Sequence, residues 1–259
     1  MQAPILWEVR HGVGHIVLNQ PERGNALGTA AAHALAAVVE QARGADIGAI
    51  LITARGKQFC VGGDIAEFAA HRTALEPLIG HMLDVIHPAV HTLATLPIPI
   101  ISAVQGPVGG GGIGLALCAD LVLASSRMFL RGGYSALGLS PDLGVSRYLT
   151  LRAGAAKAKY ILMCNHAIPA QECLRWGLVD ELHEPEQLQH AAVTLAETLA
   201  AGPTHALGGI KRLCEAAVHS TLQAQLDAER AAMLACTRSA NSLEGVAAFL
   251  EKRPPVFHR

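Results

Sequence analysis

Two stretches of the sequence follow one pattern, ILITARGKQFCVGGDI at residues 50–65 and PIPIISAVQGPVGGGGIGLALCADLVLAS at residues 97–125. An apolar run of strand length overlaps the start of each stretch, over 47–53 and 98–104. Such a run is typical of a strand buried on both faces. A loop that ends in glycines follows each run, and a short helix is expected after each loop. Repeated units of strand, loop and helix predict an α/β fold.

The sequence on either side fits this class. Two strands are expected over 5–10 and 14–19, and Thr29 is expected to cap an Ala-rich helix over 30–43. Further helices are expected over 75–96, 115–119, 186–200, 203–218, 222–236 and 242–250. We therefore predict a core of ββα units over residues 1–190 and a helical C-terminal region over residues 191–259.

The composition argues against nucleic-acid binding and against a membrane span. The 20 Lys and Arg residues nearly balance the 21 Asp and Glu residues, and aromatic residues make up 4% of the chain, so neither a basic surface nor a base-stacking platform is expected. Residues 85–119 carry no charged side chain, but four prolines and a run of glycines interrupt them. This stretch predicts several short buried elements rather than one membrane helix.

The cysteines and the N-terminal sequence bear on location. None of the six cysteines stands in a C-x-x-C pair, which indicates buried free thiols in a reducing compartment. Residues 1–14 show no basic segment followed by an apolar one, so no export signal is expected. We predict a cytoplasmic protein.

The glycines of the second stretch formally match a dinucleotide-binding fingerprint. Gly109, Gly111 and Gly114 stand at the G-x-G-x-x-G spacing after a strand. The match lacks a full crossover helix, and no Asp or Glu stands between Asp120 and Asp142 to hold a ribose. No lysine follows the glycines as it does in a Walker A loop. Nucleotide binding at this run is therefore disfavoured.

Two glycine-lined turns at the starts of helices can instead serve one anion. Backbone N–H groups at a helix N-terminus favour negative charge, and two such donors that converge form an oxyanion hole. The turns at 59–64 and 109–114 would supply one donor each. The alternative is that both are tight turns in which only glycine fits.

Four separated motifs resemble the crotonase, or enoyl-CoA hydratase/isomerase, superfamily. They are LNQPERGNAL (18–27), the two stretches at 50–65 and 97–125, and GLSPDLG (138–144), and the resemblance continues over 158–182 and 245–257. It implies a crotonase-type ββα spiral core with a helical C-terminal region, and a homotrimer or a dimer of trimers. It also implies an acyl-CoA thioester substrate, with no cofactor apart from the coenzyme A that the substrate carries.

The resemblance assigns roles to individual residues. The N–H groups of Gly63 and Gly111 would hold the thioester oxygen, and the C-terminal helices, with Phe249 and Lys252, would close over coenzyme A or pack against a neighbouring subunit. Asp64 has a second interpretation, which we favour, as the cap of the helix that begins at Ile65. Contacts with the substrate or its coenzyme A are expected at Gly24, Ala26, Val61, Asp64, Ile65, Gly110 and Tyr134.

The sequence departs from the superfamily where its hydratases carry two glutamates. These positions fall on Gly114 and on Gly133 or Tyr134, and a phenol with a pKa of about 10 is a poor base near neutral pH. Because adding water needs a group that activates it, the departures argue against hydratase activity.

One carboxylate remains in the region, that of Asp142. An aspartate at this place carries a proton in the superfamily's phenylacetyl-CoA-pathway isomerases, which residues 202–230 most resemble, and it is a nucleophile in 4-chlorobenzoyl-CoA dehalogenase. We expect an isomerase in which Asp142 moves a proton while Gly63 and Gly111 hold the enolate oxygen. The alternatives are a weak hydratase and a non-catalytic acyl-CoA-binding protein, and Asp142 itself could be a turn residue that caps the next helix.

Three histidines, His81, His87 and His91, invite a metal site because the last two stand four residues apart. Pro88 lies between them and there is no H-E-x-x-H motif. We expect no metal and interpret these residues as ordinary, partly buried histidines, one of which could line the acyl pocket.

Overall fold

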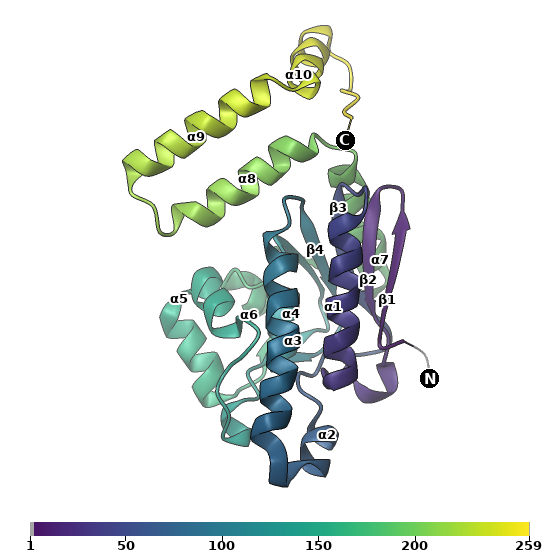
Figure 1. The fold of residues 1–259 in the computed structure, drawn as a ribbon, viewed down its shortest axis with the longest axis vertical. Coiled ribbons are helices and arrows are strands. Elements are labelled where there is room, and N and C mark those ends of the chain that lie inside the picture. Colours follow the sequence, from purple (N-terminus) through teal and green to yellow (C-terminus); the bar gives the residue numbers. More distant parts are fainter. Residues whose placement is uncertain (1–2, 259) are drawn as a thin grey trace.

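A six-stranded sheet forms the centre of the computed structural model, which describes residues 3–258 (Figure 1). The strand order is β1-β2-β3-β4-β6-β9; β1 and β2 form an antiparallel hairpin, and each later neighbour pairs in parallel. The strands are β1 (Ile5–Arg10), β2 (Val13–Leu18), β3 (Ala49–Ala54), β4 (Ile100–Val104), β6 (Leu121–Ser125) and β9 (Glu181–His183). The predicted α/β class is confirmed.

A second, three-stranded sheet lies beside the carboxyl ends of these strands. It is built from β5 (Val108–Gly109), β7 (Phe129–Arg131) and β8 (Ile168–Pro169), with β5 parallel to β7 and β8 antiparallel to it. An isolated bridge joins Cys60 to Val108. This bridge ties the loop after β3 to β5, so the two glycine turns of the sequence are held against each other.

Helices cover both faces of the large sheet. Alternate residues of β3 face opposite ways: Ile50 and Ile52 belong to the main core, whereas Leu51 packs in a second core against α7. All three are fully buried, as expected for a strand covered on both sides. The helices are α1 (Thr29–Gly44), α2 (Ile65–Ala70), α3 (Leu75–Thr95), α4 (Gly111–Leu117), α5 (Val145–Cys164), α6 (Ala170–Arg175), α7 (Pro185–Ala200), α8 (Thr204–Ala217), α9 (Leu222–Thr237) and α10 (Ala240–Glu251), with short 3-10 turns η1 (Pro21–Arg23), η2 (Arg72–Ala74) and η3 (Ser135–Leu137).

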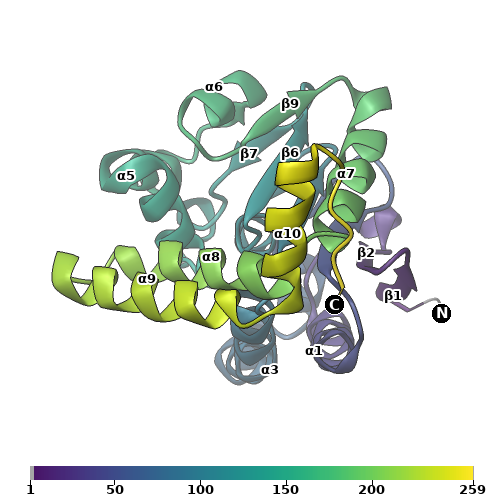
Figure 2. The same cartoon turned by 90° about the horizontal axis from the view of Figure 1, so that it is seen from above.

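The last three helices form an arm that extends from one end of the core (Figure 1), and it lies in front of the core when viewed from above (Figure 2). Within the arm α9 packs on α8 and α10 packs on α9. The predicted boundary after residue 190 falls inside α7, and α7 packs on the sheet as far as Ala200. The arm therefore begins at Thr204.

Local details differ from the sequence expectations in three places. The helix expected over 115–119 spans Gly111–Leu117 instead. Glycine has a low helix propensity, but position 112 has no room for a larger residue, because a Cβ atom on Gly112 would lie 2.5 Å from the Cys60 carbonyl oxygen. Thr29 is not a cap; Gly28 is the N-cap of α1, and Glu67 accepts hydrogen bonds from both the N–H and the hydroxyl of Thr29. Cys164 and Cys214 are exposed, so the thiols are not all buried.

Within residues 3–258, no helix is both long enough and apolar enough to cross a bilayer.

Candidate active site

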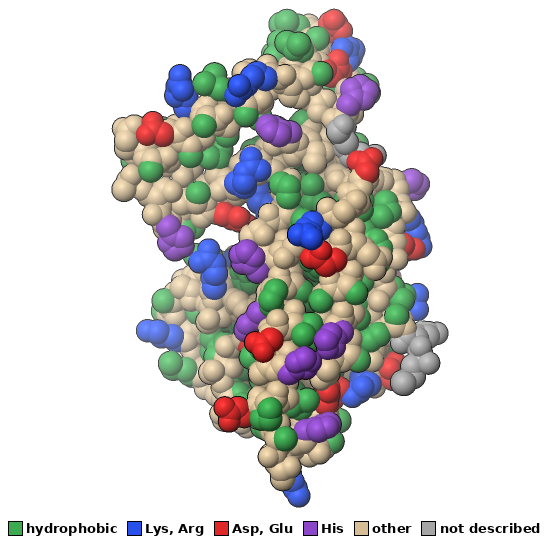
Figure 3. All heavy atoms as spheres, in the orientation of Figure 1, with side chains coloured by type: hydrophobic (Ala, Val, Ile, Leu, Met, Phe, Trp, Pro, Cys, Tyr) green, Lys and Arg blue, Asp and Glu red, His purple; other side chains and the backbone are tan. Residues whose placement is uncertain are grey.

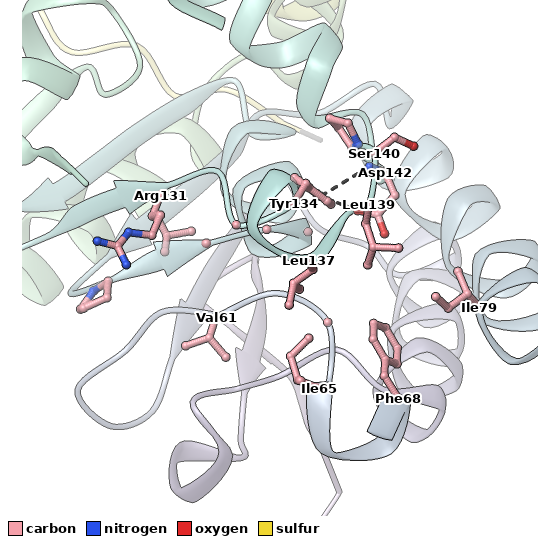
Figure 4. Close-up of a pocket in the computed structure, with 18 of the residues that line it drawn as sticks. Val61, Ile65, Phe68, Ile79, Arg131, Tyr134, Leu137, Leu139, Ser140 and Asp142 are labelled. Atoms are coloured by element: carbon pink, nitrogen blue, oxygen red, sulfur yellow. Dashed lines mark hydrogen bonds between the residues drawn. The ribbon is translucent and has the colours of Figure 1, made fainter. Parts of the chain in front are cut away.

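A cavity of about 440 Å³ opens where the loop after β3, the N-terminus of α4 and the loop after β7 meet. Its walls are mainly apolar, and Figure 4 shows Phe68 and Ile79 at one end and Arg131 at the other. Large apolar side chains of the wall are Val61, Ile65, Phe68, Ile79, Leu83, Phe129, Leu137 and Leu139. Such a cavity, with mainly apolar walls and a few polar groups, suits a ligand that is largely apolar and carries a polar group.

The two glycine turns meet in this cavity. An ideal Cβ atom built on Gly62 would lie 3.2 Å from the backbone nitrogen of Gly111, and one built on Gly110 would lie 4.0 Å from the nitrogen of Gly63. Gly62 (φ +96°) and Gly110 (φ +48°) both have positive φ values, which L side chains rarely adopt. Glycine at these positions therefore allows the two backbones to approach within contact distance.

Gly63 and Gly111, the two expected donors, both line the cavity. Gly111 is the first residue of α4, where a helix leaves its N–H groups without an intrahelical acceptor. In the part of the chain that the structure describes, neither the Gly63 nor the Gly111 N–H donates to a backbone or side-chain acceptor. Two free donors beside one cavity are the arrangement that an oxyanion hole requires.

Asp142 lies directly against one of these glycines. Its Oδ1 atom is 3.3 Å from the point that a Cβ atom of Gly111 would occupy. Among the residues of 3–258 that line the cavity, Asp142 is the only Asp or Glu. The Tyr134 hydroxyl donates to Asp142 Oδ1 at 2.5 Å, drawn as a dashed line in Figure 4. The expected proton carrier and the expected donors thus share one cavity.

The surroundings of Asp142 raise the pKa of its carboxyl group above the ordinary value. Burial is the largest cause, because it disfavours the charged form. The hydrogen bond from Tyr134 is the largest cause that acts in the opposite direction, and the electrostatic influence of His87 and a backbone hydrogen bond add to it. A carboxylate with a raised pKa is a stronger base than an exposed one, which suits it to take a proton from carbon.

The two glutamate positions of the hydratases hold no acid and leave little room for one. A Cβ atom on Gly114 would lie 2.3 Å from the Leu143 carbonyl oxygen. Gly133 has a φ value of +83°, so any other L residue would be strained there. Tyr134 follows it with a buried phenol whose pKa is raised by burial and by Asp142. None of these three positions therefore carries a carboxylate.

Of the other expected substrate contacts, Val61, Ile65, Gly110 and Tyr134 line the cavity. Gly24 and Ala26 do not line it and lie behind the first glycine turn. The Gly24 carbonyl oxygen accepts a hydrogen bond from the Val61 N–H at 3.0 Å. The Leu27 N–H donates to the Gly62 carbonyl oxygen at 2.7 Å. The segment at 24–27 therefore supports the turn from outside the cavity.

Asp64 does not line the cavity either. It is buried, it is the N-cap of α2, and its Oδ1 accepts from the Glu67 N–H at 3.1 Å. Its Oδ2 forms an ion pair with Arg23. These contacts match the capping interpretation of Asp64.

The histidines of α3 have separate surroundings. His87 lines the cavity, and its Nε2 accepts a hydrogen bond from the Leu143 N–H at 3.2 Å. His91 borders a second cavity of about 730 Å³ between the core and the arm. His81 faces the ring of His33 at 5.7 Å between centroids. Over the described residues, no three His, Cys, Asp or Glu side chains gather where they could hold a metal ion.

Sequence reasoning did not find three features of the site. It did not foresee the Tyr134–Asp142 hydrogen bond, the His87–Leu143 hydrogen bond, or Arg131 at the cavity mouth. The two hydrogen bonds join residues 8 and 56 positions apart, and each involves a residue of the irregular loop over 138–144. No periodic pattern marks such loops, so the only available signal was the presence of polar residues near GLSPDLG.

Comparison with known proteins gives one family over nearly the whole chain. The family model described as enoyl-CoA hydratase/isomerase matches residues 8–259. The chain is 37% identical over 255 residues to 1,2-epoxyphenylacetyl-CoA isomerase of Escherichia coli, covering 98% of this chain and 97% of that protein. It is 35% identical over 253 residues, with the same coverage of both chains, to a protein of Rhodobacter capsulatus named probable enoyl-CoA hydratase.

Solved structures agree on the fold. The crystal structure of an enoyl-CoA hydratase from Polaromonas sp. JS666 superposes with a TM-score of 0.92 at 32% identity, covering 98% of this chain and 99% of that one. The expected crotonase-type fold is therefore confirmed.

Proposed function

The chain belongs to the enoyl-CoA hydratase/isomerase family, and from that premise we propose that it is an isomerase that moves a proton between two carbons of an acyl-CoA thioester. The observation that carries the proposal is the place of Asp142, the one carboxylate on the cavity wall within residues 3–258, against Gly111. A single carboxylate suits a reaction in which the proton leaves one carbon and returns to another.

The proposed reaction needs no partner beyond the substrate. The N–H groups of Gly63 and Gly111 donate to the thioester carbonyl oxygen. Asp142 takes a proton from carbon, the C–H electron pair passes into the conjugated system, and the oxygen becomes an enolate. The enolate then collapses, a carbon elsewhere in the system takes the proton back from Asp142, and the carboxylate is restored. Removing one donor of such a hole typically costs ~3 kcal/mol of activation free energy.

The absence of acids at Gly114, Gly133 and Tyr134 favours this reaction over hydration. The likeness to an isomerase of E. coli supports the same choice, and the likeness to the R. capsulatus protein leaves hydration as the alternative to test. The apolar end of the cavity, with Phe68 and Ile79, favours a hydrocarbon acyl group, straight or cyclic, that carries no charge of its own.

The test is the Asp142→Asn variant, which keeps the size of the side chain and removes the base. We expect turnover of 3-enoyl-CoA to 2-enoyl-CoA, followed by absorbance of the conjugated product, to fall at least 10³-fold, with the Kd for the acyl-CoA changed less than about threefold. Full turnover by the variant would refute the role of Asp142.

Two other outcomes with the unaltered protein would overturn the isomerase proposal. A product of crotonyl-CoA that is heavier by one water would show a hydratase. Tight binding of enoyl-, phenylacetyl- and aryl-CoA thioesters with no change in any of them would show a binding protein.

The proposal extends to the arm and to coenzyme A. No residue of α9 is buried, although helices in proteins gain most of their stability from packing. We propose that second copies of this chain cover the arm in a trimer or a dimer of trimers, and that the arm helps to enclose coenzyme A. Gly24, Ala26, Val61, Asp64 and Ile65 stay predictions as the wall on which coenzyme A lies, and no other cofactor is expected.

A further inference from the structure

A short hydrogen bond joins Tyr134 to the carboxylate of Asp142. The Tyr134 hydroxyl donates to Asp142 Oδ1 at 2.5 Å, and the Asp142 N–H donates to the same phenol oxygen at 3.4 Å. Tyr134 is 8% exposed. One phenol therefore contacts both the side chain and the backbone of the carboxylate residue, in a setting that excludes most water.

The phenol is itself held in place from its backbone. The carbonyl oxygen of Tyr134 accepts from Leu137 N–H at 2.9 Å and from Leu139 N–H at 3.1 Å, which closes the η3 turn. On the other side, the Gly133 N–H donates to Asn165 Oδ1 at 2.7 Å, at the end of α5. Both flanks of the Tyr134 backbone are therefore held by hydrogen bonds that do not involve Asp142.

A second contact restrains the backbone directly after Asp142. Leu143, the next residue, has a φ value of +47°, which is unusual for a bulky side chain. Its N–H donates to His87 Nε2 at 3.2 Å. Among the residues described, no donor reaches Asp142 Oδ2. The restraints therefore leave one carboxylate oxygen, Oδ2, free to take a proton.

We propose that Tyr134 is a positioning residue for Asp142: its hydroxyl occupies Oδ1, orients the carboxylate so that Oδ2 meets the substrate, and stabilises the ionised form that acts as the base. This inference rests on the proposed function of Asp142. Tyr134 does not exchange a proton with the substrate in this role. It holds the base in the orientation that proton transfer requires, and small errors in such an orientation can cost up to about 10²-fold in rate.

The charges around Asp142 make the inference testable by titration. The groups that face it are Tyr134 from the loop after β7, His87 from α3 and the Cys60 thiol from the loop after β3. Burial raises the pKa of the Cys60 thiol to about 12, so it stays neutral in the useful range. Since the Tyr134 hydrogen bond lowers the pKa of Asp142 against the effect of burial, its removal must raise that pKa further.

The first readout uses the protein without substrate. The protein is labelled with ¹³C-aspartate and its carboxyl signals are recorded by NMR. The signal that is absent from the spectrum of Asp142→Asn belongs to Asp142, and its chemical shift in the unaltered protein is followed against pH. We expect Tyr134→Phe to move the midpoint of the Asp142 titration to higher pH by about one unit, because the ionised carboxylate loses one hydrogen bond. The matched control is Tyr148→Phe, which removes a half-buried phenol at the second cavity and should leave the midpoint unchanged.

The second readout is the isomerase reaction. Tyr134→Phe should lower kcat about 10-fold, change KM less than twofold, and move the acid limb of the pH profile in the same direction as the NMR midpoint. Added to Asp142→Asn, it should cause no further loss of rate, because it acts through the carboxylate. A purely structural role would alter thermal stability without moving either pH midpoint.

The outcomes separate the two proposals. If Asp142→Asn keeps full turnover, the proposed function fails. If Asp142→Asn is inactive while Tyr134→Phe keeps both the midpoint and the rate of the unaltered protein, only the role of Tyr134 is overturned. Should Tyr134→Phe fail to fold, fluorotyrosine at position 134 keeps the shape and strengthens the donor; the midpoint must then move to lower pH, and an unchanged midpoint would overturn the inference.

Discussion

The α-carbon of Gly114 faces the backbone of Leu143 so closely that a Cβ atom there would lie 2.3 Å from the Leu143 carbonyl oxygen and 2.8 Å from its Cβ. Leu143 directly follows Asp142, so α4 and the loop that carries the carboxylate pack without space between them. The glycine at a hydratase glutamate position is thus part of how this site is built, because it allows the Asp142 loop to approach.

Gly114→Glu should therefore not create a hydratase. We expect it to force the Asp142 loop away, to lower the free energy of unfolding by about 3 kcal/mol as overpacking does, and to reduce isomerase turnover with no water added to crotonyl-CoA. Urea denaturation and product mass measure these effects. The matched control is Gly209→Ala in α8, where a Cβ atom meets nothing within 4 Å and stability should stay equal or rise slightly. A stable, hydrating Gly114→Glu protein would contradict this account.

Asp142→Asn should be more stable than the unaltered protein near pH 7, even though we expect the variant to be inactive. Burial raises the pKa of Asp142 in the folded state, so the folded protein binds this proton more tightly than the unfolded chain does. At pH values below the pKa of Asp142 in the unfolded chain, the carboxyl group therefore adds to the free energy of unfolding. This contribution is lost as the pH rises through the pKa of Asp142 in the folded protein. Thermal unfolding of both proteins between pH 4 and pH 8 should show the advantage of the variant growing with pH and then levelling. An advantage that shrinks with pH would contradict the assignment.

The parts of the fold that sequence predicts are those marked by pattern. The apolar runs at 47–53 and 98–104 contain the buried strands β3 and β4. The polar side chain within β4, that of Ser102, is buried and donates to the Ala116 carbonyl oxygen. The glycine turns follow from their place after these strands. Gly63, Gly111 and Asp142 were predicted together, and the structure brings them to one cavity. Their chemical roles stay predictions.

The features that the sequence does not predict depend on packing between segments that are distant in the chain. The start of α4 at Gly111 runs against the low helix propensity of glycine, and the glycines of α4 lie in close contact with Cys60 and Leu143, which are distant in sequence. The Tyr134–Asp142 contact depends on the path of η3, which has no periodic signal. Arg131 reaches the cavity because β7 ends there, and nothing in residue type distinguishes it from any surface arginine.

The ion pair between Lys211 of α8 and Asp120, at 3.0 Å, should fasten the arm to the core. The Lys211 side chain is 6% exposed and that of Asp120 is 27% exposed. Lys211→Met would leave the carboxylate without its cation, and we expect a loss of about 3 kcal/mol in the free energy of unfolding, the low end for a buried pair. The double variant Lys211→Met with Asp120→Asn should recover most of the loss, because two uncharged side chains then replace the buried pair. Denaturation of the four proteins gives the coupling energy, and simple additivity would show that the pair is not coupled.

The apolar surface of the arm leads to the last prediction. Figure 3 shows apolar side chains at the surface of the arm, where Leu243 is 71% exposed and Phe249 is 83% exposed. Apolar patches of this kind mark contact surfaces, and we expect the unaltered protein to have a mass that is a multiple of its 27.1 kDa chain. Replacing Leu243 and Phe249 by Glu should reduce the mass measured by light scattering toward that of one chain, since burying carboxylates in a contact surface is costly.

The control for this change is Met163→Glu, which alters an equally exposed apolar residue, 71% exposed, on α5 outside the arm. It should leave the mass unchanged. Because association stabilises only the folded chain, the Tm of the unaltered protein should rise with protein concentration, and that of the arm variant should not. A single-chain mass for the unaltered protein over the whole concentration range would exclude self-association through the arm.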